Sequence, residues 1–364
     1  MHVTAYDGLD ELPPGCGPLF EEAGKASFFL SLAWFRNLAG QALPQDCRVR
    51  IYVAHDGDDV RGILPMKFPA GRRLAGRKLE ALSNYYSSLF MPLVASADCL
   101  QEITDEIARE RWDSVDLHPM AQDSPVFGDI EAALKHSGMS VQQYYCFGNW
   151  YLKVNERSYK DYSNALPSKL KNTLKRKGKQ FSAMASRMEI ITGIDGVDSA
   201  IAAYQKVYDS SWKIQEPHPG FMPGLIRLCA VHGWLRLGLV YLDEEPIAAQ
   251  LWIVKDGIAA IYKLAYDEKF AKLSAGSLLT AKLMEHVIDV DRVSEVDYLT
   301  GDDEYKRDWM SDRRERWGII AYNRHTLRGI LMSGFSLLKG YAKSIIGTRR
   351  NTERLIASSR SATK

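Results

Sequence analysis

Residues 251–309, LWIVKDGIAAIYKLAYDEKFAKLSAGSLLTAKLMEHVIDVDRVSEVDYLTGDDEYKRDW, contain the pattern of a strand, a small-residue turn and a helix start. Residues 258–266 are rich in Ile, Tyr, Leu and Ala and contain no Pro, which predicts a buried strand. Residues 272–277 are mostly small, and the Leu residues and Val287 after them follow helical spacing. The first N–H groups of a helix lack intrahelical partners and lie at its positive end, so this pattern predicts a pyrophosphate cradle.

A second strand, over residues 296–299, is predicted to follow this helix. Residues 300–309 then form a Gly-Asp-Asp turn, an aromatic residue and a Lys. The alternative interpretation is an ordinary crossover between two strands. In that case the small residues of the turn only let the helix pack on the strand. The turn after the second strand makes the ordered set more specific.

The ordered set consists of Ala265-Tyr266-Asp267, Ser274-Ala275-Gly276 with Leu278-Leu279, Asp297, Gly301-Asp302, Tyr305-Lys306 and Trp309. It resembles the FemAB-like and CelD-like branch of the GNAT acyltransferase superfamily, whose domain is also described as BioF2-like. The resemblance covers roughly residues 150–320 and includes residues 168–176, Ser211-Trp212-Lys213, Glu216 and residues 233–238. It implies an α/β (α+β) fold with a mixed and mostly antiparallel sheet flanked by helices. It also implies an enzyme that transfers an acyl group from a thioester to an amine.

The length of 364 residues favours two domains. Residues 1–150 are predicted to contain helices over 28–43, 103–112 and 123–137, a hairpin of 48–54 with 60–68, and strands over 114–118 and 141–147. This order matches a degenerate GNAT-like domain. Residues 151–323 are then the GNAT acyltransferase domain, with a charged turn at 313–316 and a closing strand at 317–323, and residues 324–364 are a basic tail.

Composition indicates an ordinary globular protein, with 46% hydrophobic and 25% charged residues and a net charge of +2. This charge is too small to argue for nucleic acid. The five cysteines are scattered without a C-x-x-C pair, which favours reduced thiols and no metal site. The chain starts without a signal-peptide pattern, and no uncharged run reaches the length of a bilayer span. We therefore expect a cytoplasmic protein.

For the acyl donor, the resemblance implies acyl-CoA or acetyl-CoA as co-substrate, with a carrier-protein thioester as the alternative. The backbone of Leu264, Ala265 and Tyr266 would hold the thioester carbonyl. The pyrophosphate would lie against Lys272, Ser274, Ala275, Gly276 and Ser277. This loop departs from the usual GNAT pattern, because Ala and Ser stand where glycines are expected.

For catalysis, the resemblance makes Asp267 and Asp302 candidate bases, acting directly or through a water. Lys306 would steady the oxyanion or a donor phosphate, and Tyr305 would return a proton to the departing thiolate. Acids in front of a helix also serve as caps, which is the alternative role of Asp302 and its neighbour Asp303.

For the acceptor, a small-molecule or glycan amine, the resemblance implies contacts with Trp212 by stacking and with Glu216 by charge. Tyr85 and Tyr86 offer flat faces with polar tips and are candidates for an acceptor cleft. The alternative is that both tyrosines pack the domain interface. CelD-like members suggest cell-envelope or polysaccharide-linked chemistry.

Residues 168–180 carry six Lys or Arg residues and no acid. This pattern indicates either a surface that binds phosphate groups or a charged face that only contacts solvent. CoA would supply such phosphates. So would tRNA, which makes a FemX-like aminoacyl-tRNA-dependent transferase the alternative enzyme. A catalytically inactive GNAT fold that serves as a scaffold at the membrane is the alternative outside enzymes.

The tail from Tyr322 onward holds nine basic residues and one Glu. Residues 327–346 are predicted to form an amphipathic helix that either contacts the inner membrane surface peripherally or covers an apolar patch on protein. Residues 348–364 are predicted to be disordered. The oligomeric state, the acyl chain and the acceptor stay open at this stage.

Overall fold

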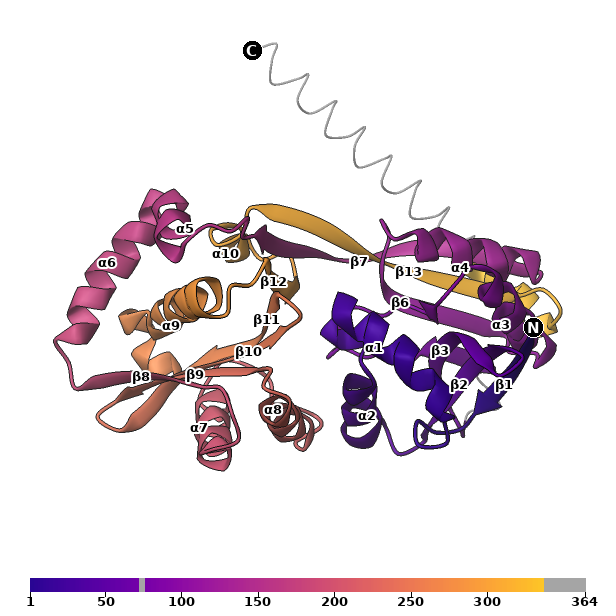
Figure 1. Ribbon diagram of the computed structural model, residues 1–364, viewed down its shortest axis with the longest axis horizontal. Helices are drawn as coiled ribbons and strands as arrows, with labels where there is room; N and C mark the ends of the chain where they lie inside the picture. The colour runs from indigo at the N-terminus through magenta and orange to yellow at the C-terminus, as the bar shows by residue number, and fades with distance from the viewer. Residues whose placement is uncertain (72–75, 337–364) are drawn as a thin grey trace, which may run out of the picture.

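The computed structural model describes residues 1–71 and 76–336, and its N-terminal lobe is a mixed sheet covered by helices (Figure 1). The strands of this lobe are β1 (His2–Tyr6), β2 (Cys47–Asp56), β3 (Asp59–Pro69), β4 (Lys78–Ala81), β5 (Leu93–Val94) and β6 (Ser114–Ala121). Its helical elements are η1 (Pro14–Cys16), α1 (Gly17–Ala26), η2 (Phe28–Leu30), α2 (Leu32–Gln41), α3 (Asp98–Arg109) and α4 (Pro125–His136). β4 and β6 run parallel, and the other pairs among these strands are antiparallel.

The predicted hairpin of this lobe is confirmed as β2 and β3, which pair across a turn where Gly57 has a φ of 61°. The helix predicted over 28–43 is divided at Ser31. The Ser31 hydroxyl accepts a hydrogen bond from the Trp34 N–H at 3.2 Å and thereby begins α2 as a new helix. β1 pairs along β2 and was not predicted.

The C-terminal lobe has the same arrangement. Its strands are β8 (Ser186–Ile191), β9 (Leu235–Leu242), β10 (Glu245–Lys255), β11 (Ile258–Tyr266) and β12 (Glu295–Thr300). Its helical elements are α5 (Tyr159–Ala165), α6 (Ser168–Ser182), α7 (Val197–Asp209), α8 (Phe221–Val231), η4 (Glu268–Leu273), α9 (Ala275–Glu285), η5 (His286–Val290) and α10 (Glu304–Arg307). β11 and β12 are parallel, as β4 and β6 are in the first lobe. This confirms the predicted mixed, mostly antiparallel fold of two GNAT-like halves.

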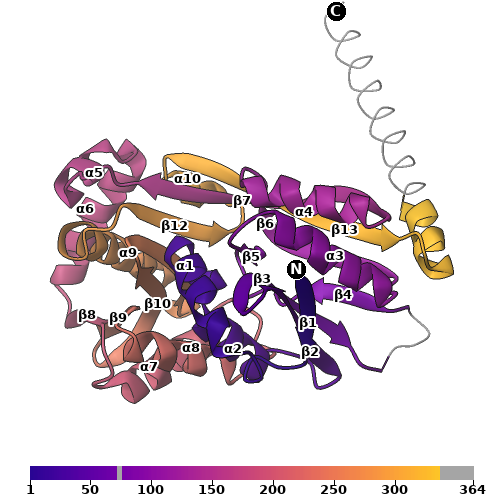
Figure 2. The same ribbon diagram turned by 45° about the vertical axis from the view of Figure 1, so that its right-hand side comes forward.

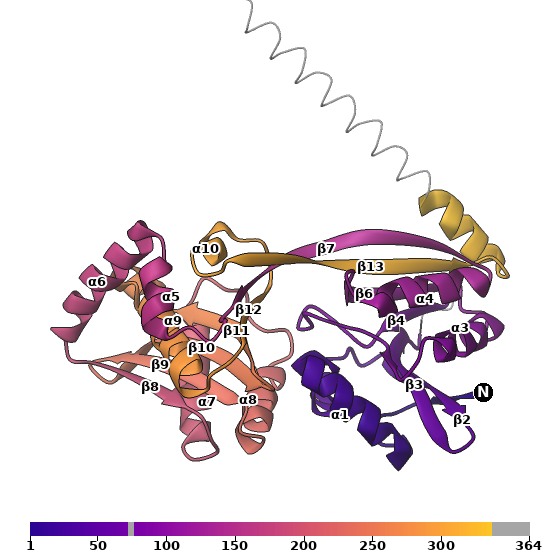
Figure 3. The same ribbon diagram turned by 45° about the horizontal axis from the view of Figure 1, so that its top comes forward.

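The two lobes are joined by an exchange of strands. β7 (Met139–Lys153) ends the first half of the chain but pairs with β12, and β13 (Asp312–Asn323) ends the second half but pairs with β6. β7 and β13 pair with each other along their length and bridge the lobes (Figure 3). The sheet of 13 strands therefore follows the order β1-β2-β3-β4-β6-β13-β7-β12-β11-β10-β9-β8, with β5 on β3.

The residues predicted as a charged turn at 313–316 lie in β13 instead. Arg314 pairs with Glu295 at 2.7 Å and with Asp297 at 2.5 Å, both on β12. The ladder to β7 and these acids let a charged segment adopt the extended strand conformation, because Arg314 reaches acidic partners on β12, the strand on the other side of β7.

One hydrophobic core runs through both lobes, and a second lies under α6 and α9 of the C-terminal lobe. α2 lies beside α8 from the other lobe (Figure 2). The ring of Trp34, which is fully buried, meets that of Phe221 edge-on at 5.8 Å between centroids. Phe28 meets Trp234 in the same way at 5.8 Å. The lobes are thus held by shared core as well as by shared strands.

The part of the predicted tail helix that the structure describes, residues 327–336, is helical. Its hydroxyl side faces the sheet, where Ser333 bonds to Ser140 at 2.9 Å and Ser336 to Gln142 at 2.7 Å. Leu327, Leu331 and Phe335 are exposed. The rest of that helix and the predicted disordered segment lie outside the described residues. In the described ranges, no helix has the length and hydropathy needed to cross a bilayer.

Candidate functional site

The two parallel strands of the C-terminal lobe separate after a short pairing. Their register runs only from Ile258 with Glu295 to Ala260 with Asp297. In β11, Tyr262 is an extra residue relative to β10, a bulge that disrupts the ladder at this point. Beyond Ala260, the edge of β11 that faces β12 therefore carries backbone groups without a neighbouring strand.

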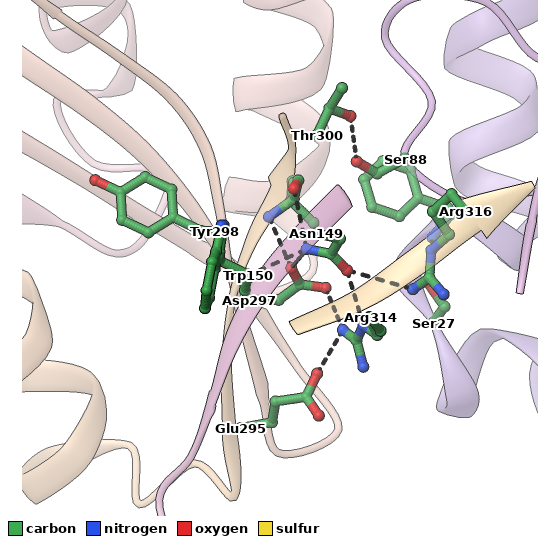
Figure 4. A network of polar contacts seen from close by, with 12 residues as sticks. Ser27, Ser88, Asn149, Trp150, Glu295, Asp297, Tyr298, Thr300, Arg314 and Arg316 are labelled. Carbon is green, nitrogen blue, oxygen red and sulfur yellow. Dashed lines mark hydrogen bonds and ion pairs between the residues drawn. The ribbon is translucent and has the colours of Figure 1, made fainter. Parts of the chain in front are cut away.

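The end of β12 is held in a strained conformation by a buried polar network (Figure 4). Leu299 has a φ of 54°, which is uncommon for a residue other than glycine. Its N–H donates to Asp297 Oδ1 at 2.7 Å, and its carbonyl accepts from Asn149 Nδ2 at 3.0 Å. Arg314 donates to Asn149 Oδ1 at 2.7 Å and completes the network. This left-handed residue stands just past the last paired position of β12 with β11, where the two strands separate.

A cleft of about 370 Å³ lies at this gap and reaches the N-terminal lobe. It is lined by Tyr85, Tyr86, Ser88, Trp212, Lys213, Ile261, Tyr262, Lys263, Leu264, Tyr298, Leu299, Thr300, Asp303, Tyr305 and Lys306. Six of these are residues that the sequence analysis proposed: Tyr85, Tyr86, Trp212, Leu264, Tyr305 and Lys306. The structure thus brings together side chains that lie far apart in the chain.

One wall of the cleft is an ion pair. Glu216 accepts from Lys263 at 2.8 Å and from the Tyr86 hydroxyl at 2.5 Å. Burial opposes the charge of Glu216, yet hydrogen bonds from Lys263 and Tyr86 hold its pKa below the usual value. Tyr86 is buried and stacks on Phe221 at 3.8 Å between ring centroids, whereas Tyr85 is exposed at the mouth. The two tyrosines therefore differ in role: Tyr86 packs in the interface between the lobes, and Tyr85 faces the cleft.

Lys213 supplies the one amine of this cleft whose pKa is lowered far toward neutrality. Burial, followed by the nearby charge of Lys263, lowers this pKa to about 8. Its Nζ lies 5.8 Å from the ring centroid of Trp212, which is half-exposed. An amine with such a pKa exists partly as the free base near neutral pH, so it is able to accept a proton.

Lys306 is buried under the end of β12. Its ammonium donates to the carbonyl of Thr300 and, at 3.4 Å each, to those of Tyr298 and Gly301. Asp303 lies 3.5 Å away. Burial lowers the pKa of Lys306, and Asp303 works against that shift. Lys306 therefore fixes the backbone of the strand that forms one side of the gap.

Tyr305 follows at the rim, where its ring lies edge-on to Tyr298 at 5.7 Å between centroids. Burial, with the charge of Asp303, raises the pKa of Tyr305 to about 12. Its hydroxyl therefore keeps its proton at neutral pH and acts as a hydrogen-bond donor.

The start of α9 lies next to this cleft. Ser274 adopts a left-handed conformation with φ 57° between η4 and α9, and its side chain makes no cap bond. The amides of the first turn thus lack intrahelical partners. Lys177 of α6 donates to the Lys272 carbonyl, which places the basic helix against this loop. A Cβ added to Gly276 would lie 3.5 Å from the Tyr266 ring, and Tyr266 lies 4.5 Å from Trp212 between ring centroids.

The two candidate bases do not line the cleft. Asp267 is buried and caps η4, since its Oδ1 accepts from the Lys269 N–H at 2.9 Å. Asp302 accepts from Trp150 at 2.8 Å and from Arg313 at 2.8 Å, and Arg313 is the main cause of its lowered pKa. A carboxylate so paired is a weak base. Ala265 is buried in β11, while Ser277 lies in the first turn of α9.

Several cleft residues were not singled out as site residues from the sequence: Ser88, Lys213, Lys263, Tyr298, Thr300 and Asp303. Lys213 belongs to the Ser211-Trp212-Lys213 triplet of the family resemblance, and this triplet was the signal for it. In the sequence, Lys263 and Tyr298 look like ordinary strand residues. They line the cleft only because β11 and β12 separate at this point. In the described residues, no group of His, Cys, Asp and Glu is arranged to hold a metal ion.

Comparisons with known proteins agree with this fold. Residues 168–307 match the family described as "Acetyltransferase (GNAT) domain". No curated protein matches the sequence significantly. Among solved structures, FemX has 10% identity and a TM-score of 0.60, with 89% of this chain and 97% of FemX covered.

Two further structures are similar over nearly their full length. A conserved protein of unknown function from Bacteroides thetaiotaomicron has 10% identity and a TM-score of 0.55, with 88% of this chain and 99% of that chain covered. A tandem GNAT protein from the clavulanic acid biosynthesis pathway has 11% identity and a TM-score of 0.50, with 87% and 98% covered. At these identities the likeness establishes the fold.

Proposed function

Residues 168–307 form a GNAT domain of the FemAB-like branch, and on that premise we propose that the protein transfers an acyl group from a thioester to an amine. The donor is acyl-CoA, or a carrier protein that bears the same thioester. The acceptor amine lies in the cleft between the lobes. The observation that carries this proposal is the gap between β11 and β12, which opens directly onto that cleft.

Two features on either side of Tyr266 support this donor. The open first turn of α9, beside Lys177 and Lys272, suits a diphosphate. From there Tyr266, whose ring lies 4.5 Å from that of Trp212 between centroids, leads to the cleft. A thioester carbonyl at the unpaired edge of β11 would receive hydrogen bonds from backbone N–H groups as it becomes an oxyanion.

The proton balance of the reaction falls to residues of the cleft. The acceptor nitrogen attacks the carbonyl, a C–N bond forms, and Lys213 in its neutral form takes the proton from the nitrogen. The C–S bond then breaks, Tyr305 gives its proton to the departing thiolate, and the proton held by Lys213 returns to Tyr305 through water, so that both residues end in their starting forms. Lys306 acts as a positioning residue, because its ammonium is occupied by the carbonyls of β12.

The acceptor is an amine with a flat or apolar portion. Tyr85 and Trp212 expose ring faces at the mouth, as a small-molecule or glycan amine requires for stacking. Glu216 is already paired with Lys263, so its role is to hold that wall rather than to attract the amine. A place in cell-envelope or polysaccharide metabolism follows from the CelD-like resemblance.

The direct test combines binding with turnover. Thermal shift and calorimetry with CoA and acetyl-CoA measure donor binding, and release of free thiol in the presence of a panel of amines measures transfer. We expect stabilisation by acyl-CoA and amine-dependent thiol release. Absence of any response at millimolar acyl-CoA would overturn the acyl-CoA assignment. Binding without thiol release for any amine would favour the inactive scaffold.

A second candidate donor is an aminoacyl-tRNA, and α6 is the observation that favours it. Lys169, Lys171, Lys175, Arg176 and Lys179 are all exposed on this helix, and among the described residues none of them forms an ion pair. Filter binding of charged tRNA tests this donor, with affinity expected to fall steeply as salt rises. Salt-independent or undetectable binding would exclude it.

A further inference from the structure

A second cavity, of about 320 Å³, lies between the lobes behind the proposed acyl-transfer cleft. The two cavities meet at Ser88 and Leu299, which line both. A hydrogen bond of 2.7 Å between the hydroxyls of Ser88 and Thr300 stands at this partition (Figure 4). The second cavity is therefore a separate space with its own lining.

Arg316 of β13 lines this cavity and is buried, with 6% of its surface exposed. Its Nε has no hydrogen-bond partner among the described residues. One long contact is present, from Nη2 to Asn149 Oδ1 at 3.5 Å (Figure 4). A guanidinium is always charged at neutral pH and offers five N–H donors, so a buried one with this little compensation is unusual.

The other cations around the cavity are already paired. Arg314 is paired with Glu295 and Asp297, and it takes the better bond to Asn149 at 2.7 Å. Lys255 donates to the Gly24 carbonyl at 2.7 Å and also contacts Asp256. Asp123 stands exposed at the rim, outside ion-pair distance of Arg316. Asp297, Asp123 and Glu295 act on Arg316 only at longer range, so among the cations of this lining Arg316 is the one without a partner at ion-pair distance in the described part of the chain.

We propose that this cavity is a binding site for a small carboxylate, whose two oxygens meet the guanidinium of Arg316 while an apolar body fills the remaining space. The fork of an arginine matches the geometry of a carboxylate. We expect the rest of the ligand to be apolar, because the same cavity is also lined by Phe28, Leu89, Ile253 and Ile258. Binding at this site does not depend on acyl transfer, and it adds a second ligand to the protein.

The unliganded protein carries the cost of an unpaired buried charge, and this makes the site testable apart from folding. Replacing such a charge with an apolar side chain of similar length is neutral or stabilising, whereas loss of a structural ion pair is strongly destabilising. We therefore expect Arg316→Met to melt at the same temperature as the wild-type chain or above it. A large fall in melting temperature would show that Arg316 is a structural residue and would overturn the proposal.

The ligand test uses thermal shift of the full chain with phenylpropionate, its neutral amide and inorganic phosphate. Phenylpropionate is expected to raise the melting temperature by about 3 °C at a concentration tenfold above its Kd. The neutral amide and phosphate are expected to leave it unchanged. Stabilisation by phosphate alone, or by the amide as strongly as by the acid, would contradict a carboxylate site.

Two variants place the effect in this cavity. Arg316→Met is expected to lose the shift, whereas Arg313→Met, on the same strand but bonded to the exposed Asp302, is expected to keep it. Ala26→Trp fills the mouth from an exposed position and leaves Arg316 intact. It is expected to lose the shift as well. A shift that persists in both Arg316→Met and Ala26→Trp would place the ligand elsewhere and overturn the assignment.

Discussion

Lys213 is the residue on which the proposed chemistry depends most. It lies in the cleft with Lys263 and Lys306, and burial followed by the charge of Lys263 lowers its pKa to about 8. Because the neutral amine is the form that takes a proton, kcat/KM is expected to rise as pH increases through about 8. Removal of the group in Lys213→Met should cost about 100-fold or more in kcat/KM and abolish that limb of the pH profile.

The matched control for this prediction is Lys206→Met, which removes an exposed lysine of α7 bonded to Glu245. It should retain both the rate and the pH profile. Steady-state rates of thiol release from pH 6 to 10 provide the measurement. An unchanged pH limb in Lys213→Met would remove Lys213 from the proton transfer.

Removal of the Lys306 side chain is expected to lower the free energy of unfolding, and any loss of rate follows from that. In Lys306→Met, the carbonyls of Tyr298, Thr300 and Gly301 lose their shared donor inside the protein. Unsatisfied buried acceptors cost on the order of 3 kcal/mol in total. Urea denaturation should therefore show this loss, whereas Lys272→Met, at the surface of the adjacent loop, should leave the free energy of unfolding unchanged. Loss of activity at full stability would instead indicate direct contact with the reacting atoms.

Among the helices and strands, the basic helix α6 is expected to make donor binding depend on salt concentration. Lys177 ties this helix to the loop before α9, and the exposed cations stand beside it. Changing Lys171, Lys175 and Arg176 to Gln should weaken donor binding by about tenfold and reduce the slope of affinity against salt. Lys135→Gln in α4 is the control. Equal salt slopes in the triple variant and the wild-type chain would make α6 a solvated face.

The helix over residues 327–336 keeps its hydroxyl side on the sheet and exposes Leu327, Leu331 and Phe335. An exposed apolar row of this kind is suited to the boundary of an anionic bilayer. In liposome flotation, the double change of Leu331 and Phe335 to Asp should therefore reduce binding, while Ile194→Asp, an exposed apolar residue elsewhere, should not. Identical flotation of both variants would exclude this helix as the contact.

For the molecule as a whole, the exchange of β7 and β13 and the shared core predict cooperative unfolding of the two lobes. Trp34 stands in that core against Phe221 and Tyr262. Trp34→Ala should cost about 3–5 kcal/mol and lower the stability of both lobes together. Hydrogen exchange of amides in β3 and β10 during denaturation measures this coupling. Separate transitions for the two strands would show that the lobes are independent.

Local patterns were sufficient for most elements. Ile258–Tyr266 coincides with the predicted strand, and the small residues after it begin α9 as expected. The β2–β3 hairpin also follows from its turn residues and alternation, because a hairpin depends on neighbours in the chain. The same patterns led to a charged turn at 313–316, since a strand whose charges are matched by β12 looks polar when it is read alone.

The amino-acid sequence alone thus determined the GNAT-like order of strands and helices, the helix start at Ser274 and six of the fifteen residues that line the cleft. Only the tertiary structure decided that Asp302 is occupied by Arg313 and that Lys213, Lys263 and Tyr86 meet in one cleft. It alone also buried Arg316 with its Nε unbonded within the described residues. The physical reason is that helices and strands arise from interactions between near neighbours, whereas the charge state and reach of a side chain depend on groups that folding brings from distant parts of the chain.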